Sequence, residues 1–370
     1  MALPAGISKV NQFLSSSRAA LGSAKNVQCV MGNEAADLDS MASSVMYAYF
    51  NAQNAGTAGD TVFVPVINVP REDFKLRTEA VYLFKEAGID IGLLLFMDEV
   101  DLGALKAKGR LMLTLVDHNK LASFQEQLAG CVVEIIDHHK DEGLFTGAST
   151  RIIEPVGSAA TLVAEALLAK GNQRLEQGSA TLLLGTILLD TVNLDPEAKR
   201  ATPKDQQVVE QLLKSTGADR KGLFDMLQKE KFNVSALDTS DLLRKDYKEW
   251  KVGKIQVGIS SVLLPIADWL VKDTKLSSSL DKYAKARKLD VLIAMNAYTE
   301  PQFTRELVVF CPDASLRGKL LSFLSGSDLG LAPMAASTVD KATALFAQAN
   351  QSYSRKKLQP LIDGFFGNLG

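Results

Sequence analysis

Short apolar runs alternate with helix-like stretches through the first part of this chain. Each run is bounded by turn-forming or charged residues, and the runs cover residues 27–31, 61–69, 91–97, 110–116 and 131–136. Strands that are buried on both faces give continuous apolar runs, and helical connections between strands give parallel sheets. The sequence therefore predicts an α/β fold that begins with a mostly parallel sheet with helices on both faces.

The pattern changes after about residue 195. Thr202 is the expected N-cap of a helix with Pro203 at its first position, just as Ser40 is the expected N-cap of a helix that begins at Met41. Later strands are predicted at 255–264, 290–298 and 305–310, and helical stretches near 266–288 and 336–350. We expect a linker near 220–230 between a first domain, residues 1–222, and a smaller α+β domain, residues 230–370.

Composition narrows the class of protein. Hydrophobic residues make up 46% of the chain, charged residues make up 23%, and the formal net charge is −2. That charge argues against a nucleic-acid partner held by a broadly basic surface. No apolar stretch reaches the roughly 20 residues that a bilayer-spanning helix needs. The three cysteines are far apart in the sequence, which predicts free thiols and favours a cytoplasmic protein.

The first 33 residues contain no acidic side chain. Together with several serines and basic residues, this composition is a weak sign of an organellar transit segment, mitochondrial or other. An amphipathic helix explains the same residues better, with Ile7, Val10, Phe13 and Leu14 facing the core. We expect that helix.

All three histidines fall in two motifs that close apolar runs, Asp117-His118-Asn119 and Asp137-His138-His139. Asp37 and Asp39 follow another run, and Asp190 closes the run GTILLD. Ligands of open α/β sheets gather beyond the carboxyl ends of the strands, and carboxylates and imidazoles are common ligands of divalent cations. The joint pattern predicts a metal-dependent hydrolase of phosphoesters or phosphoanhydrides.

Each motif alone has an ordinary structural explanation. An Asp-x-Asp sequence is usually a solvated turn, and Asp190 could simply cap a helix. Taken together, a turn could aim Asp37 and Asp39 at two adjacent cations, with Asp117 bridging and His138 and Asp190 completing the set. Two cations about 3.5–4 Å apart would lower the pKa of a water between them toward about 7.

Four segments together resemble the motifs of the DHH phosphoesterase superfamily: GNEAADLDS (32–40), LVDHNK (115–120), IIDHHKDEG (135–143) and GTILLDTVNL (185–194). KDYKEW (245–250) and residues 354–357 resemble its second subfamily, which contains family II inorganic pyrophosphatases, cytosolic exopolyphosphatases and prune-like phosphoesterases. The resemblance extends from about residue 27 to residue 360.

The resemblance implies a DHH domain and a DHH-associated domain with the active site in the cleft between them. It implies two divalent cations, Mg²⁺ or Mn²⁺ with Co²⁺ as a further candidate. The implied metal ligands are Asp37, Asp39, Asp117, His138 and Asp190. The implied catalytic residues are Asp117 and His139, and the implied substrate-binding residues are Asn33, His118, His139, Lys248, Arg355 and Lys356.

One position separates the branches of this subfamily. The pyrophosphatases carry histidine where this chain has Asn33, whereas the exopolyphosphatase and prune-like branch carries asparagine. An amide oxygen is a weaker ligand for transition metals than imidazole, so Asn33 predicts tolerance of Mg²⁺ or a contact with substrate. Residues 69–79 also resemble that branch, where Arg71 and Arg77 either extend a phosphate track or pair with Glu72 and Glu79.

The favoured function is an exopolyphosphatase that removes terminal phosphates from polyphosphate, acting as a monomer without a nucleic-acid or membrane partner. The alternatives are an inorganic pyrophosphatase and a prune-like enzyme for short polyphosphates or cyclic nucleotides. A DHH nuclease is disfavoured because no histidine follows residue 139. A partner-binding protein without catalytic activity is disfavoured because every expected carboxylate ligand is present.

Overall fold

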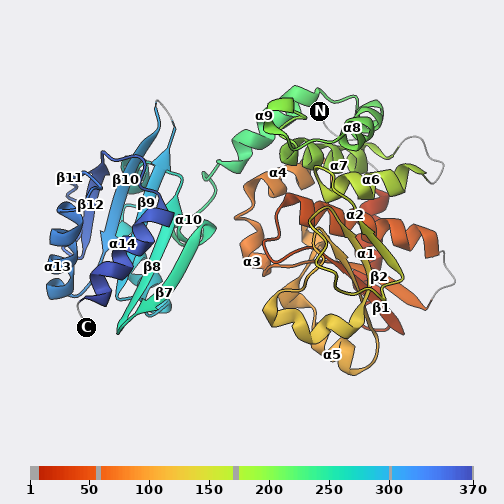
Figure 1. The fold of residues 1–370 in the computed structure, drawn as a ribbon, viewed down its shortest axis with the longest axis horizontal. Helices are drawn as coiled ribbons and strands as arrows, with labels where there is room; N and C mark the ends of the chain where they lie inside the picture. Colours follow the sequence, from red (N-terminus) through yellow and green to blue (C-terminus); the bar gives the residue numbers. More distant parts are fainter. Residues whose placement is uncertain (1–7, 56–59, 170–174, 300–301, 369–370) are drawn as a thin grey trace. The chain divides into compact units, whose positions relative to one another are not determined.

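The computed structural model describes residues 8–55, 60–169, 175–299 and 302–368. The chain forms two compact units, unit 1 (Met1–Lys231) and unit 2 (Phe232–Gly370) (Figure 1). The segment near 220–230, expected to be a linker, is instead helix α9 (Arg220–Lys231), whose Leu227 is fully buried in unit 1. Unit 1 therefore ends after α9, at Lys231, rather than at residue 222, where the first domain was expected to end.

A six-stranded sheet forms the centre of unit 1, and all its neighbouring strands pair in parallel, as predicted. The order is β3-β2-β1-β4-β5-β6. The strands are β1 (Asn26–Met31), β2 (Thr61–Ile67), β3 (Leu95–Phe96), β4 (Leu111–Val116), β5 (Val132–Asp137) and β6 (Thr150–Ile153). The apolar run at 91–97 is mostly not a strand, because Ile91–Leu93 forms a 3₁₀ turn capped by Asp90.

Helices cover both faces of this sheet. Successive residues of β1 point to opposite faces, so Val30 joins one apolar cluster and Cys29 the other, and both are fully buried. The helices of unit 1 before α9 are α1 (Lys9–Ala20), α2 (Leu38–Ala55), α3 (Arg71–Phe74), α4 (Thr78–Glu86), α5 (Leu102–Ala107), α6 (Ala159–Ala169), α7 (Gln177–Asp190) and α8 (Pro203–Thr216).

Three helix predictions can be compared with these bounds. In α1, Val10 and Leu14 are buried and Phe13 packs against the core as expected, while Ile7 lies outside the described residues. Helix α8 has the predicted Thr202 cap and Pro203 start. The predicted cap at Ser40 is wrong. Helix α2 begins at Leu38, and Asp37 accepts the hydrogen bond from the Ser40 N–H at 3.0 Å.

Unit 2 is an α+β unit with a mixed six-stranded sheet in the order β11-β12-β10-β9-β8-β7. Strands β8 and β9 pair in parallel and the other neighbours are antiparallel. The strands are β7 (Tyr247–Val252), β8 (Ile255–Val262), β9 (Val291–Tyr298), β10 (Thr304–Phe310), β11 (Leu331–Met334) and β12 (Thr343–Gln348). The helices are α10 (Thr239–Lys245), α11 (Ile266–Lys272), α12 (Leu276–Ala286), α13 (Ala314–Ser325) and α14 (Arg355–Gly367).

The helix predicted near 336–350 is wrong, because β12 occupies that segment and pairs with β10. Burial in the sheet explains the difference, since alternate residues of β12 such as Leu345 are needed in the core, and tertiary packing overrides helix propensity. The three cysteines are free, as expected. Within the described residues, no helix has both the length and the apolar character required to cross a bilayer.

Candidate metal centre

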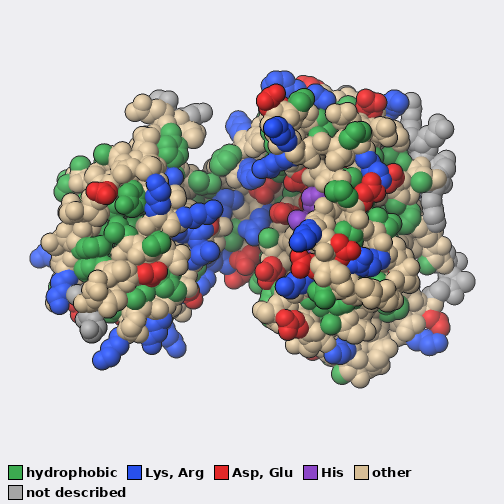
Figure 2. All heavy atoms as spheres, viewed as in Figure 1, with side chains coloured by type: hydrophobic (Ala, Val, Ile, Leu, Met, Phe, Trp, Pro, Cys, Tyr) green, Lys and Arg blue, Asp and Glu red, His purple; other side chains and the backbone are tan. Residues whose placement is uncertain are grey.

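The five predicted metal ligands line one pocket of unit 1 with a volume of about 320 Å³. His139 lines it too, and Figure 2 shows histidine side chains (purple) beside acidic side chains (red) in this part of the surface. The full lining is Asp37, Asp39, Asp117, His138, His139, Val156, Gly157, Asp190 and Arg200. The lining residues thus come from positions as far as 163 residues apart in the sequence, from Asp37 to Arg200.

Parallel strands explain most of this convergence. Strands β1, β4 and β5 are neighbours, and the chain leaves each of them at the same edge of the sheet. Asp37 follows β1, Asp117 follows β4 and His138 follows β5, while Asp39 lies in the first turn of α2. Asp190 was expected at the end of a strand, but it is the last residue of helix α7.

Asp117 lies at the centre of the constellation. Its backbone has a φ of 60°, a left-handed conformation that costs a residue other than glycine about 1–3 kcal/mol. Its Oδ2 accepts hydrogen bonds from Ser40 Oγ at 2.7 Å and Asn33 Nδ2 at 2.9 Å, and its Oδ1 lies 3.2 Å from His138 Nε2. The strained backbone and these partners hold a carboxylate that is 2% exposed in one orientation.

His138 presents a defined nitrogen to the pocket. Its Nδ1 donates to the carbonyl oxygen of Val156 at 2.9 Å, which leaves Nε2 facing Asp117 and Asp39. Burial alone would lower the pKa of His138, but the hydrogen bond to Asp117 and the charge of Asp39 outweigh it and raise the pKa to about 10. Without a metal, this imidazole is therefore a cation that partly neutralises the acidic cluster.

Asp39 and Asp190 have opposite surroundings. Asp39 is buried at the N-terminus of α6, where it accepts hydrogen bonds from the N–H groups of Ala159 at 2.6 Å and Ala160 at 2.8 Å. Asp190 Oδ2 is buried and has no hydrogen-bond partner among the residues that the structure describes. Burial, with the nearby charge of Asp37, raises the pKa of Asp190 to about 7.

These features fit divalent cations. Four carboxylates share one pocket, burial and the charge of Asp117 raise the pKa of Asp39, and one oxygen of Asp190 has no donor in the described part of the chain. Such a cluster is electrostatically unfavourable until positive charge enters it. One ligand atom each from Asp117, His138 and His139 lies within 4.8 Å of the others, which is a spacing that a single ion can occupy.

His139 is oriented by a residue that the sequence analysis did not assign to the site. Asp137 is fully buried, and its Oδ1 lies 2.9 Å from His139 Nδ1 and accepts the backbone N–H groups of His138 and His139. The hydrogen bond to Asp137 raises the pKa of His139, whose side chain is 56% exposed. Asn119 also donates to Asp137. The sequence did contain one sign of this role, because Asp137 belongs to the same motif as His138 and His139.

Asn33 and His118 do not line the pocket. The amide nitrogen of Asn33 donates to Asp117, and its oxygen accepts the N–H groups of Ala35 at 2.9 Å and Ala36 at 3.1 Å. His118 Nδ1 lies 2.9 Å from the carbonyl oxygen of Val116, and its Nε2 is buried without a hydrogen-bond partner within the described part of the chain. Both residues support the motif that carries Asp117.

The two arginines of segment 69–79 do not pair with Glu72 and Glu79, and each contacts another protein acceptor in the described structure. Arg71 forms an ion pair with Glu99, with Nη2 and Oε2 2.9 Å apart, and lies 4.5 Å above the ring of Phe96. Arg77 donates to the carbonyl oxygen of Ala35 at 2.8 Å, so it fastens the loop before α2. Neither arginine lines the acidic pocket.

The three predicted basic residues of unit 2 lie on neighbouring elements. Lys248 is exposed on β7, and Arg355 and Lys356 open α14, which packs on β7. Arg355 donates to Asp246 Oδ1 at 2.7 Å and its side chain is 19% exposed, whereas Lys356 is exposed. Their contact with substrate stays a prediction.

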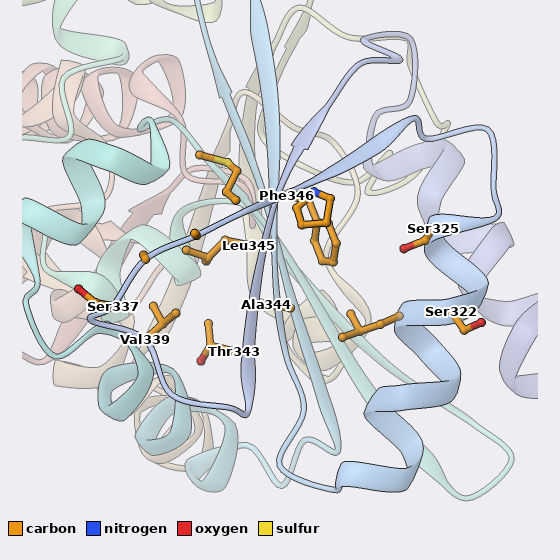
Figure 3. A pocket seen from close by; sticks show the side chains of 13 residues that line it. Ser322, Ser325, Ser337, Val339, Thr343, Ala344, Leu345 and Phe346 are labelled. Carbon is orange, nitrogen blue, oxygen red and sulfur yellow. The ribbon is translucent and has the colours of Figure 1, made fainter.

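A larger pocket, of about 800 Å³, lies on unit 2 between α13 and the strands β11 and β12 (Figure 3). Its lining is mostly apolar with a few hydroxyl groups, among them Ser322, Ser337 and Thr343, and none of the described residues that line it has a titratable side chain.

Comparison with known proteins covers both units. A model described as the DHH family, N-terminal domain, matches residues 28–187, and a DHHA2 domain model matches residues 225–365. Exopolyphosphatase PRUNE1 of Bos taurus is 39% identical over 362 residues, which are 95% of this chain and 78% of that protein. The manganese-dependent inorganic pyrophosphatase of Methanothrix thermoacetophila is 26% identical, over 72% of this chain and 79% of that protein. A solved structure of a Methanococcus jannaschii putative family II inorganic pyrophosphatase has a TM-score of 0.47 and 22% identity, and the match covers 92% of this chain and 99% of that one.

Proposed function

Because the chain belongs to the DHH family and carries a DHHA2 domain, we propose that it is a metal-dependent exopolyphosphatase. The proposed reaction is hydrolysis of the terminal phosphoanhydride bond of inorganic polyphosphate with release of orthophosphate. The observation that supports it most is the meeting of Asp37, Asp39, Asp117, His138 and Asp190 in one pocket. The similarity to a named exopolyphosphatase supports the choice of substrate.

The cofactors would be two divalent cations, Mg²⁺ or Mn²⁺, with Co²⁺ as a further candidate. Asp117, at the centre of the constellation, would bridge them, and Asp37, Asp39, His138 and Asp190 would complete the ligand set. Bound cations would supply positive charge for the phosphate oxygens and make water more acidic. Manganese is supported by the similarity to the manganese-dependent pyrophosphatase of Methanothrix thermoacetophila.

His139 would donate a proton or hydrogen bond to a phosphate oxygen from Nε2. Its Nδ1 is engaged with Asp137, and this hydrogen bond raises the pKa of His139, which shifts the ring toward its protonated form. A cationic donor beside a transferring phosphoryl group stabilises the charge that develops there. Asp137 would act through His139 by fixing its ring.

Unit 2 would supply Lys248, Arg355 and Lys356 to the phosphates of the substrate. Ammonium and guanidinium groups suit a polyanion, and Lys248 and Lys356 are exposed. We also propose that the protein acts as a cytoplasmic monomer without a nucleic-acid partner. Free cysteines and the net charge of −2 support this part of the proposal.

Inorganic pyrophosphatase is the specific alternative. Asn33 argues against it, because its nitrogen points to Asp117 and its oxygen is used by the Ala35 and Ala36 N–H groups. No ligand atom at this position is left for the metal, unlike the imidazole that the pyrophosphatase motif provides.

A phosphate-release panel tests the proposal. The purified chain would be given long polyphosphate, tripolyphosphate, pyrophosphate, a cyclic nucleotide and a dinucleotide, each with Mg²⁺, Mn²⁺ or Co²⁺. We expect release of orthophosphate from the polyphosphates and loss of release with EDTA. Faster turnover of pyrophosphate than of tripolyphosphate would favour the alternative, and no release from any phosphoanhydride would refute the proposed function.

A further inference from the structure

Arg200 is a residue of the acidic pocket that the sequence analysis did not single out. It is exposed at the pocket that Asp37, Asp39, Asp117 and Asp190 line. Within the described residues, its guanidinium forms no hydrogen bond and no ion pair, although four carboxylates share its pocket. Arg200 is therefore a cation with unused donors beside the candidate metal centre.

Three other arginines of unit 1 are engaged with protein acceptors. Arg71 pairs with Glu99, Arg77 donates to Ala35 and Arg151 pairs with Asp141. Arg200 forms no ion pair with the acidic cluster, because none of the four carboxylates lies within 4.0 Å of its guanidinium in the described structure. Its donors are thus available to a ligand.

The backbone around Arg200 is fastened to the site. Asp205 is fully buried, and its Oδ2 accepts the Gly157 N–H at 2.8 Å and the Thr202 N–H at 2.6 Å. Thr161 Oγ1 donates to the other oxygen of Asp205 at 2.6 Å. Asp205 therefore connects the start of α8 to Gly157. Gly157 directly follows Val156, whose carbonyl oxygen orients His138.

Gly157 shows how closely these two segments pack. A Cβ at this position would lie 2.8 Å from the carbonyl oxygen of Arg200 and 2.5 Å from Thr191 Cγ2. Only glycine permits such an approach. The main chain of Arg200 is consequently held beside the residues that surround His138 and Asp190, and its long side chain begins from a fixed point.

We propose that Arg200 binds a non-bridging oxygen pair of a substrate phosphate, as a phosphate-binding residue that unit 1 supplies by itself. A guanidinium group presents parallel N–H donors that match two oxygens on one phosphorus atom. Metal cations in the pocket would be bound by the carboxylates as well as by the substrate. Phosphate oxygens that do not contact a cation would still need hydrogen-bond donors. This inference rests on the proposed function, since it names a further substrate contact of the same site.

The test compares two neighbouring charge removals, Arg200→Gln and the matched control Lys199→Gln, in the full chain. Lys199 carries the same charge one residue earlier but does not line the pocket. Loss of a charge-assisted contact predicts an increase in KM for tripolyphosphate, and a fall in kcat/KM, of about 10- to 100-fold for Arg200→Gln. For Lys199→Gln we expect KM and kcat/KM to change less than about twofold. Arg200→Lys should keep part of kcat/KM, because lysine retains the charge but lacks the parallel N–H donors of the guanidinium.

Two binding measurements separate a phosphate contact from a structural role. Isothermal titration of imidodiphosphate, a phosphoanhydride mimic, should show weaker binding to Arg200→Gln in the presence of Mn²⁺. Titration of Mn²⁺ alone should give the same affinity as for the unchanged protein. Loss of Mn²⁺ affinity, or equal effects of the Arg200 and Lys199 variants, would overturn the inference.

The inference and the proposed function can fail separately. If the unchanged protein releases no phosphate but binds imidodiphosphate, and Arg200→Gln weakens that binding, the exopolyphosphatase proposal fails and the phosphate contact stands. If the protein is active and Arg200→Gln has normal KM and normal imidodiphosphate affinity, the contact is wrong and the function stands. Arg200→Lys, a milder change at an exposed position, covers the case in which Arg200→Gln folds poorly.

Discussion

Replacing Asp190 by asparagine should stabilise the metal-free protein at alkaline pH and weaken the metal-bound protein. Asp190 is enclosed beside Asp37, one of its oxygens has no hydrogen-bond partner in the described structure, and its pKa rises from an ordinary value of 3.8 to about 7. An ionised Asp190 is therefore unfavourable in the folded protein when no cation is present. Asparagine keeps the shape of the side chain and removes its charge.

The pKa shift sets the sign and size of the effect. Between about pH 4 and pH 7 the folded protein holds a proton on Asp190 that the unfolded chain has lost, so this carboxyl lowers the free energy of unfolding as pH rises. At about 1.4 kcal/mol for each pH unit, the loss reaches at most about 4 kcal/mol above pH 7. Asp190→Asn should recover much of it, with a benefit about 2 kcal/mol larger at pH 8 than at pH 5.5.

Urea unfolding in EDTA, followed by far-ultraviolet circular dichroism, measures this change. Both tryptophans, Trp250 and Trp269, belong to unit 2, so their fluorescence separately reports the unit that lacks Asp190. Asp60→Asn is the matched control, because Asp60 is 66% exposed and pairs with Lys25 at the surface. Its effect should stay within about 0.5 kcal/mol at both pH values.

Manganese should reverse the order of stability. Cations that bind the folded protein raise its free energy of unfolding in proportion to the logarithm of their concentration over the dissociation constant. Because Asp190→Asn removes one proposed ligand, Mn²⁺ should stabilise the variant less than the unchanged protein. An apo variant that is no more stable than the parent at pH 8, or one that gains as much from Mn²⁺, would refute the electrostatic reasoning.

Three further outcomes are expected. Asp117→Ala should lower phosphate release by about a thousandfold or more while circular dichroism shows an intact fold, since it removes the central carboxylate; normal release would rule out a bridging role. Asn33→His should shift the ratio of pyrophosphate to polyphosphate hydrolysis about tenfold toward pyrophosphate and favour Mn²⁺ or Co²⁺, because imidazole adds a ligand; an unchanged ratio would remove Asn33 as the determinant. Asp137→Asn should lower the pKa of His139, because their hydrogen bond raises it, and move the alkaline limit of the kcat profile to lower pH. The same profile in parent and variant would show that His139 does not need its proton.

The strand-end motifs were predictable because the geometry of parallel sheets leaves few alternatives. Parallel strands end at one edge of the sheet, so Asp37, Asp117 and His138 were expected at that edge, and the neighbouring positions of β1, β4 and β5 bring them together. The same reasoning was wrong about the element that carries Asp190. A short, continuously apolar run is compatible with a buried strand or a buried helix, and GTILLD is part of a helix enclosed on nearly all sides.

Residues that act through long-range contacts were beyond sequence reasoning. Asp205 joins Gly157 across 48 positions, and Arg200 reaches the pocket through that connection. Nothing in the local sequence around Arg200 distinguishes it from a solvated basic residue. The helix expected at 336–350 was wrong for a related reason. This alanine-rich segment contains strand β12, because it pairs with β10, which lies outside the local sequence.

The amino-acid sequence by itself determined the α/β class of unit 1 and the chemical character of its site, because apolar periodicity and the identity of a few acidic and imidazole groups are local properties. Only the tertiary structure decided which atoms are free to act. It assigned Asn33 to support Asp117, gave His139 its partner Asp137, and left Arg200 without a partner among the residues that the structure describes. Those assignments depend on distances between segments that the chain brings together only when both faces of the sheet are packed.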